Sequence, residues 1–244
     1  MNELLDRQIK QLQKYIDDGI DIVFFGGAGV STESGIPDFR SATGIFTNNL
    51  SAENIISHDY FYYNPKGFYD FYKNKMMYLD AKPNVCHNKL SELEKAGKHI
   101  TIITQNIDGL HQKAGSTNVI ELHGSIHRNF CTNCGASYDA KFIKESKGVP
   151  TCPKCGSIIK PDVVLYGEPL REENINKAIS ALEQADLLIV GGTSLKVYPA
   201  ASFIHFFKGD KKVYINLENE QLDEDFMYIQ SKLGDVFSKI EIHE

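Results

Sequence analysis

The sequence predicts an α/β fold, a Rossmann-like parallel sheet with helices on both faces. Short, fully apolar runs alternate with segments of helical periodicity. Strands of a parallel sheet covered on both faces have this continuous apolar character, whereas half-exposed strands alternate. The runs that predict strands are residues 22–25, 100–103, 119–120, 163–165, 187–190 and 213–215.

Helical segments separate several of these strands. Residues 88–95 and 172–184 have helical patterns, and the N-terminal segment repeats apolar residues at helical spacing among charges. Gly19 follows that segment where a glycine ends a helix. We therefore expect an N-terminal amphipathic helix packed on the sheet, with the apolar residues Leu4, Leu5, Ile9, Leu12 and Ile16.

Two segments interrupt the α/β rhythm. Residues 41–82 are rich in Phe and Tyr at helical spacing, which predicts a helical insert whose aromatic side chains mostly form core. Residues 125–159 carry four cysteines and predict a zinc-binding module. The remaining residues, 1–40, 83–124 and 160–244, are expected to form the Rossmann-like domain. The core positions expected in the insert include Phe61, Phe68, Phe71, Tyr72 and Met76.

Composition narrows the class of protein. The chain has 244 residues, 42% of them hydrophobic, which suffices for a sizeable core. Its net charge of −6 argues against a nucleic-acid surface, because neutralising phosphates needs a basic face. No apolar run reaches the length of a membrane span, and no signal peptide is evident. We expect a cytoplasmic protein that binds neither nucleic acid nor membranes.

The cysteines form two knuckles. Cys131 and Cys134 make one Cys-x-x-Cys-Gly motif, Cys152 and Cys155 the other, and seventeen residues separate them. Four thiolates at this spacing predict a closed tetrahedral zinc site without an open position for water, so the metal is structural. Two redox pairs are the alternative, but they lack an adjoining thioredoxin-like βαβ unit. The fifth cysteine, Cys86, is expected to be a buried small hydrophobe.

A glycine-rich loop follows the first predicted strand. Its backbone N–H groups are suited to a pyrophosphate, although a plain strand-to-helix turn is an open alternative. The sequence Pro37-Asp38-Phe39-Arg40 favours a nucleotide, because an aromatic ring can cover it and an arginine can clamp its phosphates. Thr32 replaces the third glycine of the ordinary dinucleotide fingerprint, and no ribose-binding acid follows in a clear second strand. A standard dehydrogenase is therefore a poor fit.

Polar motifs follow the predicted strands in turn. Because the carboxyl ends of parallel strands lie along one edge of a sheet, we expect these motifs to meet there in one binding site. The motifs are Gly26-Gly27-Ala28-Gly29, residues 105–111 (Gln-Asn-Ile-Asp-Gly-Leu-His), His123-Gly124, Gly191-Gly192-Thr193-Ser194 and Asn216-Leu217-Glu218.

In this order along nearly the whole chain, the motifs resemble those of the sirtuins, the NAD-dependent protein deacylases. The loops at 27–40 and 192–200 resemble the cofactor loops, and 104–111 resembles the ribose and nicotinamide segment. His123-Gly124 matches the catalytic pair, the four cysteines match the zinc module, and 161–168 resembles the substrate-binding strand. Two positions depart from the family pattern: Gly26 stands where many members have a hydroxyl residue, and Tyr166 replaces a usual Phe.

The resemblance implies a reaction in which NAD is consumed rather than reduced. The acyl-lysine carbonyl oxygen attacks the ribose carbon that bears nicotinamide, and nicotinamide leaves. His123 is implied as general base for a ribose hydroxyl, a task for a side chain that titrates near neutrality. Asp108 is implied to accept from the nicotinamide carboxamide, and Asn106 to bind a ribose hydroxyl or a water.

The resemblance also implies the remaining contacts. An extended acyl-lysine peptide is expected to add as a strand along Val163 and Val164. His87 and His111 are expected to be structural. The implied substrate-binding residues are Val163, Val164, Tyr166, Gly167, Glu168, Tyr72 and Lys75. The implied cofactor-binding residues are Gly27, Ala28, Gly29, Thr32, Phe39, Arg40, Gln105, Asn106, Ile107, Asp108, His123, Gly192, Thr193, Ser194, Asn216, Leu217, Asp235 and Val236.

The acyl group is the open question. Sirtuins that prefer acidic acyl groups carry a Tyr and, three residues later, an Arg; this chain has Tyr72 and Lys75. A lysine lacks the two-pronged grip of an arginine on a carboxylate, so we expect acetyl-lysine to be preferred over succinyl-lysine. NAD-dependent ADP-ribosyl transfer to protein and a non-catalytic NAD-sensing module are the rival functions. A general base such as His123 speaks against a sensor.

Overall fold

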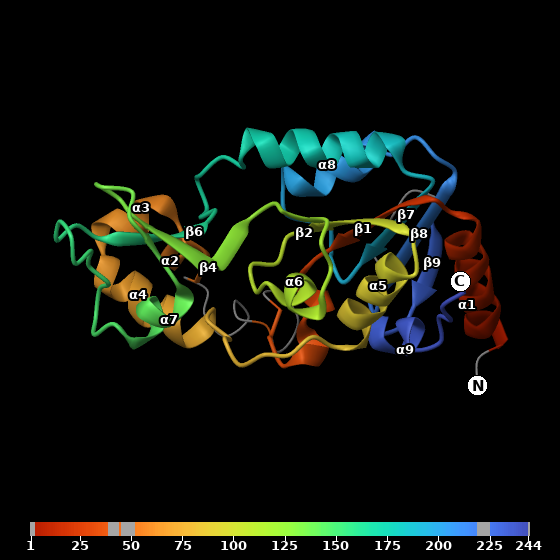
Figure 1. Cartoon of the computed structure of the whole chain (residues 1–244), viewed down its shortest axis with the longest axis horizontal. Helices are drawn as coiled ribbons and strands as arrows, with labels where there is room; N and C mark the ends of the chain where they lie inside the picture. The colour runs from red at the N-terminus through yellow and green to blue at the C-terminus, as the bar shows by residue number, and fades with distance from the viewer. Residues whose placement is uncertain (1–2, 39–43, 45–51, 219–224, 244) are drawn as a thin grey trace.

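Two separate sheets organise the chain in the computed structural model, which describes residues 3–38, 44, 52–218 and 225–243 (Figure 1). The larger sheet has six parallel strands in the order β3-β2-β1-β7-β8-β9, the strand order of a Rossmann-type sheet. These strands are β1 (Asp21–Gly26), β2 (His99–Thr104), β3 (Val119–Glu121), β7 (Leu187–Gly191), β8 (Lys211–Asn216) and β9 (Met227–Gln230).

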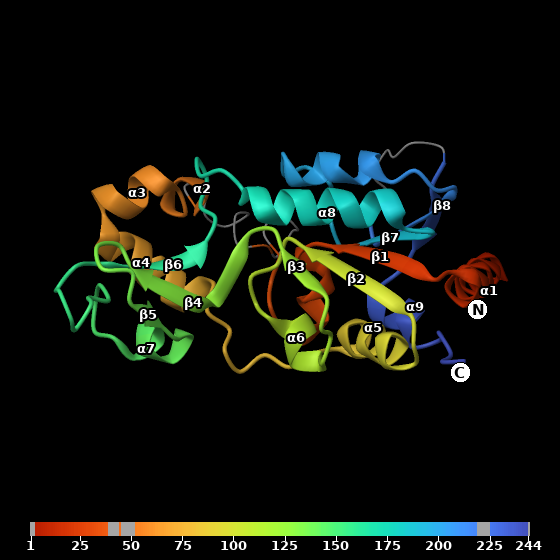
Figure 2. The ribbon, with the colours of Figure 1, turned by 45° about the horizontal axis from the view of Figure 1, so that its top comes forward.

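Both faces of the larger sheet are covered. Successive side chains of each strand point to opposite sides, so each strand contributes to two buried clusters. On β1, Ile22 and Phe24 belong to one buried cluster, and Val23 and Phe25 to the other. The helices α1 (Glu3–Asp18), α5 (Val85–Lys95) and α9 (Leu233–Phe237) cover the first face. The second is covered by α8 (Glu172–Gln184) and the 3-10 helix η3 (Ala200–Phe206), which lie above the sheet in Figure 2.

The helix boundaries follow the sequence signals. The N-terminal helix buries Ile9, Leu12 and Ile16 as predicted, and the N–H of Gly19 donates to the carbonyl of Tyr15 just after its end. At the start of α5, the Asn84 side chain accepts from the first turn and the His87 side chain faces back to the Asn84 backbone. This reciprocal capping satisfies N–H groups that a helix start leaves without partners.

The smaller sheet is antiparallel, with the order β5-β4-β6. Its strands are β4 (Gly124–Cys131), β5 (Ser137–Tyr138) and β6 (Ile159–Val163). Around it lie α2 (Ala52–Ile55), α3 (His58–Tyr63), α4 (Pro65–Lys75) and α7 (Ala140–Glu145), at the left of Figure 1. The helical insert and the cysteine-bearing segment share one buried cluster, whose members include Phe61, Phe68, Tyr69, Tyr72, Met76, Ile126, Cys131, Ile143 and Ile159.

The sequence prediction of a parallel strand at 163–165 is wrong. The strand there is β6, which ends at Val163 and pairs antiparallel with β4 in the smaller sheet. An apolar run of three residues carries no information on its partner, and β4 provides the free edge next to it. The strands β4, β5 and β9 were also not anticipated. Among the helices of the described residues, none has the length and apolarity that a membrane span requires.

Candidate active site

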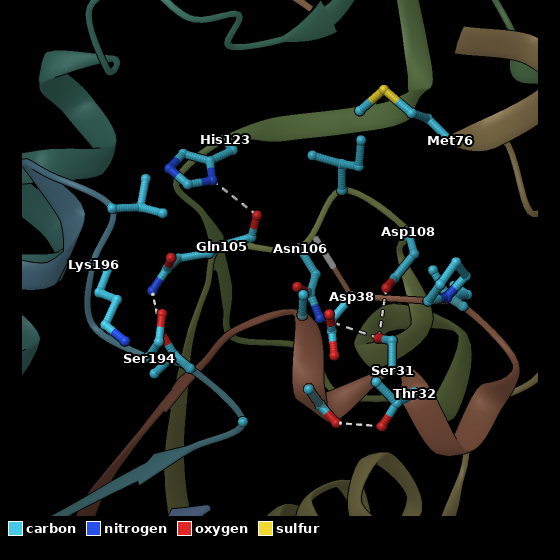
Figure 3. A pocket seen from close by; sticks show the side chains of 18 of the residues that line it. Ser31, Thr32, Asp38, Met76, Gln105, Asn106, Asp108, His123, Ser194 and Lys196 are labelled. Carbon is cyan, nitrogen blue, oxygen red and sulfur yellow. Dashed lines mark hydrogen bonds between the residues drawn. The ribbon is translucent and has the colours of Figure 1, made fainter. Parts of the chain in front are cut away.

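A cavity of about 780 Å³ opens at the carboxyl edge of the larger sheet, where the two sheets meet (Figure 3). The loops after β1, β2, β7 and β8 line one part of it, and the segment after β6 lines the other. Ligands of open parallel sheets bind at this edge. The predicted meeting of the polar motifs is therefore what the structure shows.

The glycine-rich loop continues from β1 into two short 3-10 helices, η1 (Ala28–Val30) and η2 (Thr32–Ser34). Its glycines let it touch the loop after β7: the Gly29 N–H donates to the Gly192 carbonyl at 2.8 Å. A Cβ on Gly27 or Gly29 would lie within 3 Å of that second loop. The close backbone approach that glycine permits thus joins two cofactor loops, while Ala28, Gly29 and Thr32 line the cavity.

Asn106, Asp108 and Ser31 form one hydrogen-bonded group on the cavity wall (Figure 3). The Asn106 amide donates to the Gly27 carbonyl and to the Ser31 hydroxyl, at 3.0 and 3.1 Å. Ser31 donates in turn to the Asp108 carboxylate at 2.7 Å. Ser31 is buried and was missed in the sequence, where its position two residues after Gly29 in the cofactor loop was the available signal.

His123 lies on the short connection between the two sheets, between the end of β3 and the start of β4. Its Nδ1 lies 3.0 Å from the Gln105 carbonyl oxygen, which only accepts, so Nδ1 carries the proton and Nε2 is a free base. Burial lowers the pKa of His123 below its ordinary value, against a smaller raising effect of the Gln105 hydrogen bond. The imidazole is therefore neutral at pH 7.

Gly124 sets the position of His123 against the smaller sheet. Its φ is +78°, and a Cβ there would lie 1.9 Å from the Asp162 carbonyl oxygen, so no other residue fits without a backbone shift. The carbonyl of His123 accepts from the Val164 N–H at 3.0 Å. The candidate base is thus joined by a backbone hydrogen bond to Val164, in the segment expected to bind the substrate peptide.

The loop after β7 is held by residues of β8. The Thr193 carbonyl accepts from the Tyr214 hydroxyl at 2.6 Å and from the Asn216 amide at 3.2 Å. The predicted contacts Gly192, Thr193, Ser194, Asn216 and Leu217 all line the cavity. Asp235 and Val236 do not: they lie on α9, where Val236 is buried in the core, and residues 231–233 line the cavity at this end instead.

The candidate peptide strand follows β6, which is an edge strand among the described strands of the smaller sheet. Val163, Val164, Tyr166, Gly167 and Glu168 all line the cavity. The Glu168 carboxylate is engaged inside this segment: it pairs with Lys160 at 3.0 Å and accepts from the Leu165 N–H. Its role in the described structure is to shape the strand.

The structure separates the two candidate acyl-pocket residues. Tyr72 is fully buried, stacks on Phe68, and is absent from the cavity lining. Lys75 is exposed and lines the cavity, as does Met76. Phe39 and Arg40 lie outside the described residues, so their predicted roles stay predictions.

The four predicted zinc ligands form the second centre. The sulfurs of Cys131, Cys134, Cys152 and Cys155 all lie within 4.8 Å of one another, and no other such group occurs among the described residues. A tetrahedral zinc with Zn–S bonds of about 2.3 Å requires sulfurs about 3.8 Å apart, so the group fits the metal. Cys86 is fully buried among apolar side chains, as predicted.

The thiols of this group differ in acidity. Backbone and side-chain hydrogen bonds from Ser157 lower the pKa of Cys155 to about 6, which favours the thiolate that a metal needs. The Ala136 backbone also favours the thiolate of Cys134, but the neighbouring sulfurs outweigh it and raise the pKa of Cys134 to about 11. A bound divalent cation would remove this opposition between crowded sulfurs.

The Rossmann-type sheet and the groove at its carboxyl edge define a dinucleotide-binding protein with an attached four-cysteine centre. Residues 27–199 match the Sir2 family, and the chain belongs to it. An NAD-dependent protein deacetylase of Clostridium perfringens is 53% identical over 242 residues, which cover 97% of this chain and 99% of that relative.

Solved structures agree over nearly the whole chain. A Sir2 structure with a deacetylated p53 peptide and 3'-O-acetyl ADP ribose superposes with a TM-score of 0.88 at 37% identity, covering 94% of this chain and 96% of that one. A Sir2 structure bound to an acetylated peptide superposes with a TM-score of 0.85 at 36% identity, covering 95% and 96%. The resemblance found in the sequence is thereby confirmed.

Proposed function

We infer that this chain is an NAD-dependent protein-lysine deacetylase that transfers the acetyl group of acetyl-lysine to ADP-ribose, with His123 as general base. The observation that carries the assignment is the place of His123. Its free Nε2 belongs to a neutral imidazole in the groove, and its own carbonyl is bonded to the candidate peptide strand. NAD, when bound, supplies the ribose carbon that accepts the acetyl oxygen and the nicotinamide that leaves.

His123 takes a proton from a ribose hydroxyl in this proposal. A base for that step must be neutral at working pH, and the lowered pKa of His123 meets this requirement. The hydrogen bond of Nδ1 to the Gln105 carbonyl fixes the tautomer, because Nδ1 can then only donate. Gln105 itself lines the cavity and is proposed as a ribose contact.

Asp108 and Asn106 orient the other end of the reacting group. Asp108 accepts from Ser31 through one carboxylate oxygen and from the Leu110 N–H through the other, so its direction is fixed before a ligand arrives. We propose that Asp108 binds the nicotinamide carboxamide and that Asn106 binds a ribose hydroxyl or a water. Such pre-set polar groups stabilise a transition state without reorganising.

Acetylated protein segments are the proposed second substrate. An extended peptide would add along Val163 and Val164, where main-chain pairing accepts many sequences. The division into a Rossmann-like domain (1–40, 83–124 and 160–244), a helical insert (41–82) and a zinc-binding module (125–159) is proposed with it, except that residues 160–163 of β6 belong to the smaller sheet. We also propose a cytoplasmic enzyme, supported by the gathering of four thiols for metal rather than for disulfides.

The decisive experiment is turnover of a panel of acyl-lysine peptides with NAD, followed by mass spectrometry. Deacetylation yields nicotinamide, O-acetyl-ADP-ribose and free lysine in equal amounts. Labelled NAD separates the main rival: if the label stays on protein rather than appearing in a small acetylated product, the enzyme is an ADP-ribosyltransferase. Absence of any NAD consumption with every peptide would leave only a binding module.

A further inference from the structure

The strand that follows His123 contains a bulge. Ser125 of β4 pairs with Asp162 of β6, but the next pair is Asn129 with Pro161, so three residues of β4 have no counterpart on β6. These residues are Ile126, His127 and Arg128, which we call the β4 bulge. Bulges bend a strand and redirect its side chains, and they are frequent beside active sites.

Each residue of the β4 bulge holds a different part of the groove. The Ile126 N–H donates to the Ile107 carbonyl at 3.0 Å. The His127 Nε2 lies 2.9 Å from the Asp108 carbonyl oxygen, which can only accept, so the imidazole donates. Both contacts reach the segment whose side chains face the cofactor end of the cavity.

Arg128 joins two carboxylates instead. Its Nη1 donates to Glu121 and its Nε to Asp162, both at 2.7 Å. The exposed fractions of these carboxylate side chains are 9% and 6%, whereas that of Arg128 is 44%. Glu121 precedes His123 by two residues, and Asp162 precedes Val163 directly. Arg128 therefore connects the strand before the base to the peptide strand.

Secondary contacts make this connection rigid. Gln112 donates to the second oxygen of Glu121 at 2.9 Å, and Arg171 pairs with the second oxygen of Asp162. Charge-assisted hydrogen bonds that fill both oxygens of a carboxylate fix its orientation. Buried ion pairs add little net stability, because desolvation offsets the attraction, so the geometry is the stronger reason for this one.

We propose that the β4 bulge positions the two substrates separately: His127 holds the Asp108 segment for NAD, and Arg128 holds the Val163–Val164 segment against His123 for the peptide. The proposal rests on the proposed function for the identity of the two ligands. Neither residue lines the cavity, so each acts through the segment it binds. Both are positioning residues.

The test compares variants at the two neighbouring positions. Arg128→Gln should lower kcat/KM for an acetyl-lysine peptide about 10- to 100-fold, while the NAD dissociation constant from titration calorimetry changes less than about twofold. Arg128→Lys, which keeps the charge but reaches one carboxylate at a time, should recover part of the loss. Arg7→Gln on the exposed face of α1 is the matched control and should behave as wild type.

His127→Ala should show the opposite pattern, with a larger effect on NAD than on the peptide. Loss of the donor to the Asp108 carbonyl should weaken NAD binding about 3- to 10-fold, with a smaller change in peptide KM at saturating NAD. His127→Gln, whose amide can donate to the same carbonyl, should restore NAD binding. General loosening of the fold would instead weaken both substrates in both variants, so zinc content and melting temperature are measured alongside.

Equal effects on NAD and peptide at both positions, or wild-type kinetics in Arg128→Gln, would overturn the proposal. If Arg128→Gln fails to fold, Arg128→Gln combined with Glu121→Gln removes the buried carboxylate that loses its cation, while Asp162 keeps Arg171, and this double variant serves in its place. Wild-type turnover of an acetyl-lysine peptide with NAD, and wild-type calorimetry with NAD and with peptide, are measured first. Failure of deacetylation there contradicts the proposed function, whereas the ratio between variants tests the bulge.

Discussion

The two sheets of this protein are stabilised in different ways. The parallel sheet is buried on both faces between two apolar clusters, and its two central strands, β1 and β7, are buried at every residue except Asp21. The antiparallel sheet has three short strands, and four thiols gather at its far end. A sheet of that size buries too little apolar surface to stand alone, so a metal takes over part of the task.

The groove lies where the two sheets meet, and each sheet contributes residues proposed to bind one of the two substrates. Loops of the parallel sheet present the groups proposed for NAD, and the edge of the antiparallel sheet presents the proposed peptide strand. His123 belongs to the connection between them. We therefore expect cofactor binding to depend on the parallel sheet and peptide binding to depend on the sheet that carries the four cysteines.

The largest expected effect is at the connection itself. His123→Ala should reduce deacetylation about 10²- to 10⁴-fold, because it removes the proposed general base. NAD binding should persist, since the loops of the parallel sheet are untouched. Steady-state turnover with NAD titration calorimetry checks both, with His205→Ala on an exposed position as control. Turnover near the wild-type rate would refute the role of His123.

Removing the metal should impair the function of the smaller sheet and leave that of the parallel sheet intact. One zinc per chain is expected by elemental analysis, and Cys152→Ser should lose it, lower the melting temperature and abolish most peptide turnover. NAD should still bind, because the parallel sheet has its own core. Cys86→Ala, outside the sulfur group, should keep its zinc. A zinc-free Cys152→Ser protein with full activity and stability would show that the smaller sheet does not depend on the metal.

Low pH should lower the free energy of unfolding through a buried histidine pair that packs beside the parallel sheet. The rings of His87 and His111 lie 4.6 Å apart between α5 and the helix α6 (Leu110–Ala114). Burial lowers the pKa of His87 to about 4. Below pH 6.5 the unfolded chain takes up the proton first, so stability is complete above pH 6.5 and declines as the pH falls towards 4.

The corresponding variant is His87→Gln, which can keep the capping contact to Asn84 without titrating. Between pH 7 and 4.5 its free energy of unfolding should fall by roughly 2 kcal/mol less than that of wild type. Denaturant unfolding at several pH values measures this, and His99→Gln at an exposed position is the control. An identical pH dependence in wild type and variant would exclude His87 as the cause.

The smallest effect is expected at the acyl pocket, on the side of the smaller sheet. Acetyl-lysine should be processed better than succinyl-lysine on one peptide, and Lys75→Ala should change acetyl turnover less than about threefold, because an exposed lysine contributes little. Lys73→Ala is compared with it, because Lys73 lies on the same helix but does not line the cavity. Faster succinyl turnover that only Lys75→Ala loses would show a charge-selective pocket.

Much of the parallel sheet could be predicted because its signals are local. Five of its six strands appear as apolar runs, and the polar motifs follow directly after them. The sixth, β9, was missed although Met227, Tyr228 and Ile229 form a short apolar run; it lies at one edge of the sheet, and Ile229 is its one buried residue. The cysteine spacing was equally informative, since four sulfurs at one point require two knuckles.

The sequence by itself determined the fold class, the order of motifs, the cysteine centre and the family, because these depend on residue type and spacing along the chain. Only the tertiary structure placed β6 in the second sheet, brought Ser31 to Asn106 and Asp108, and brought Arg128 to Asp162. These contacts join residues distant in sequence. Such contacts form because strand edges and buried charged groups need hydrogen-bond partners, and the partners that are within reach are decided only when the chain has folded.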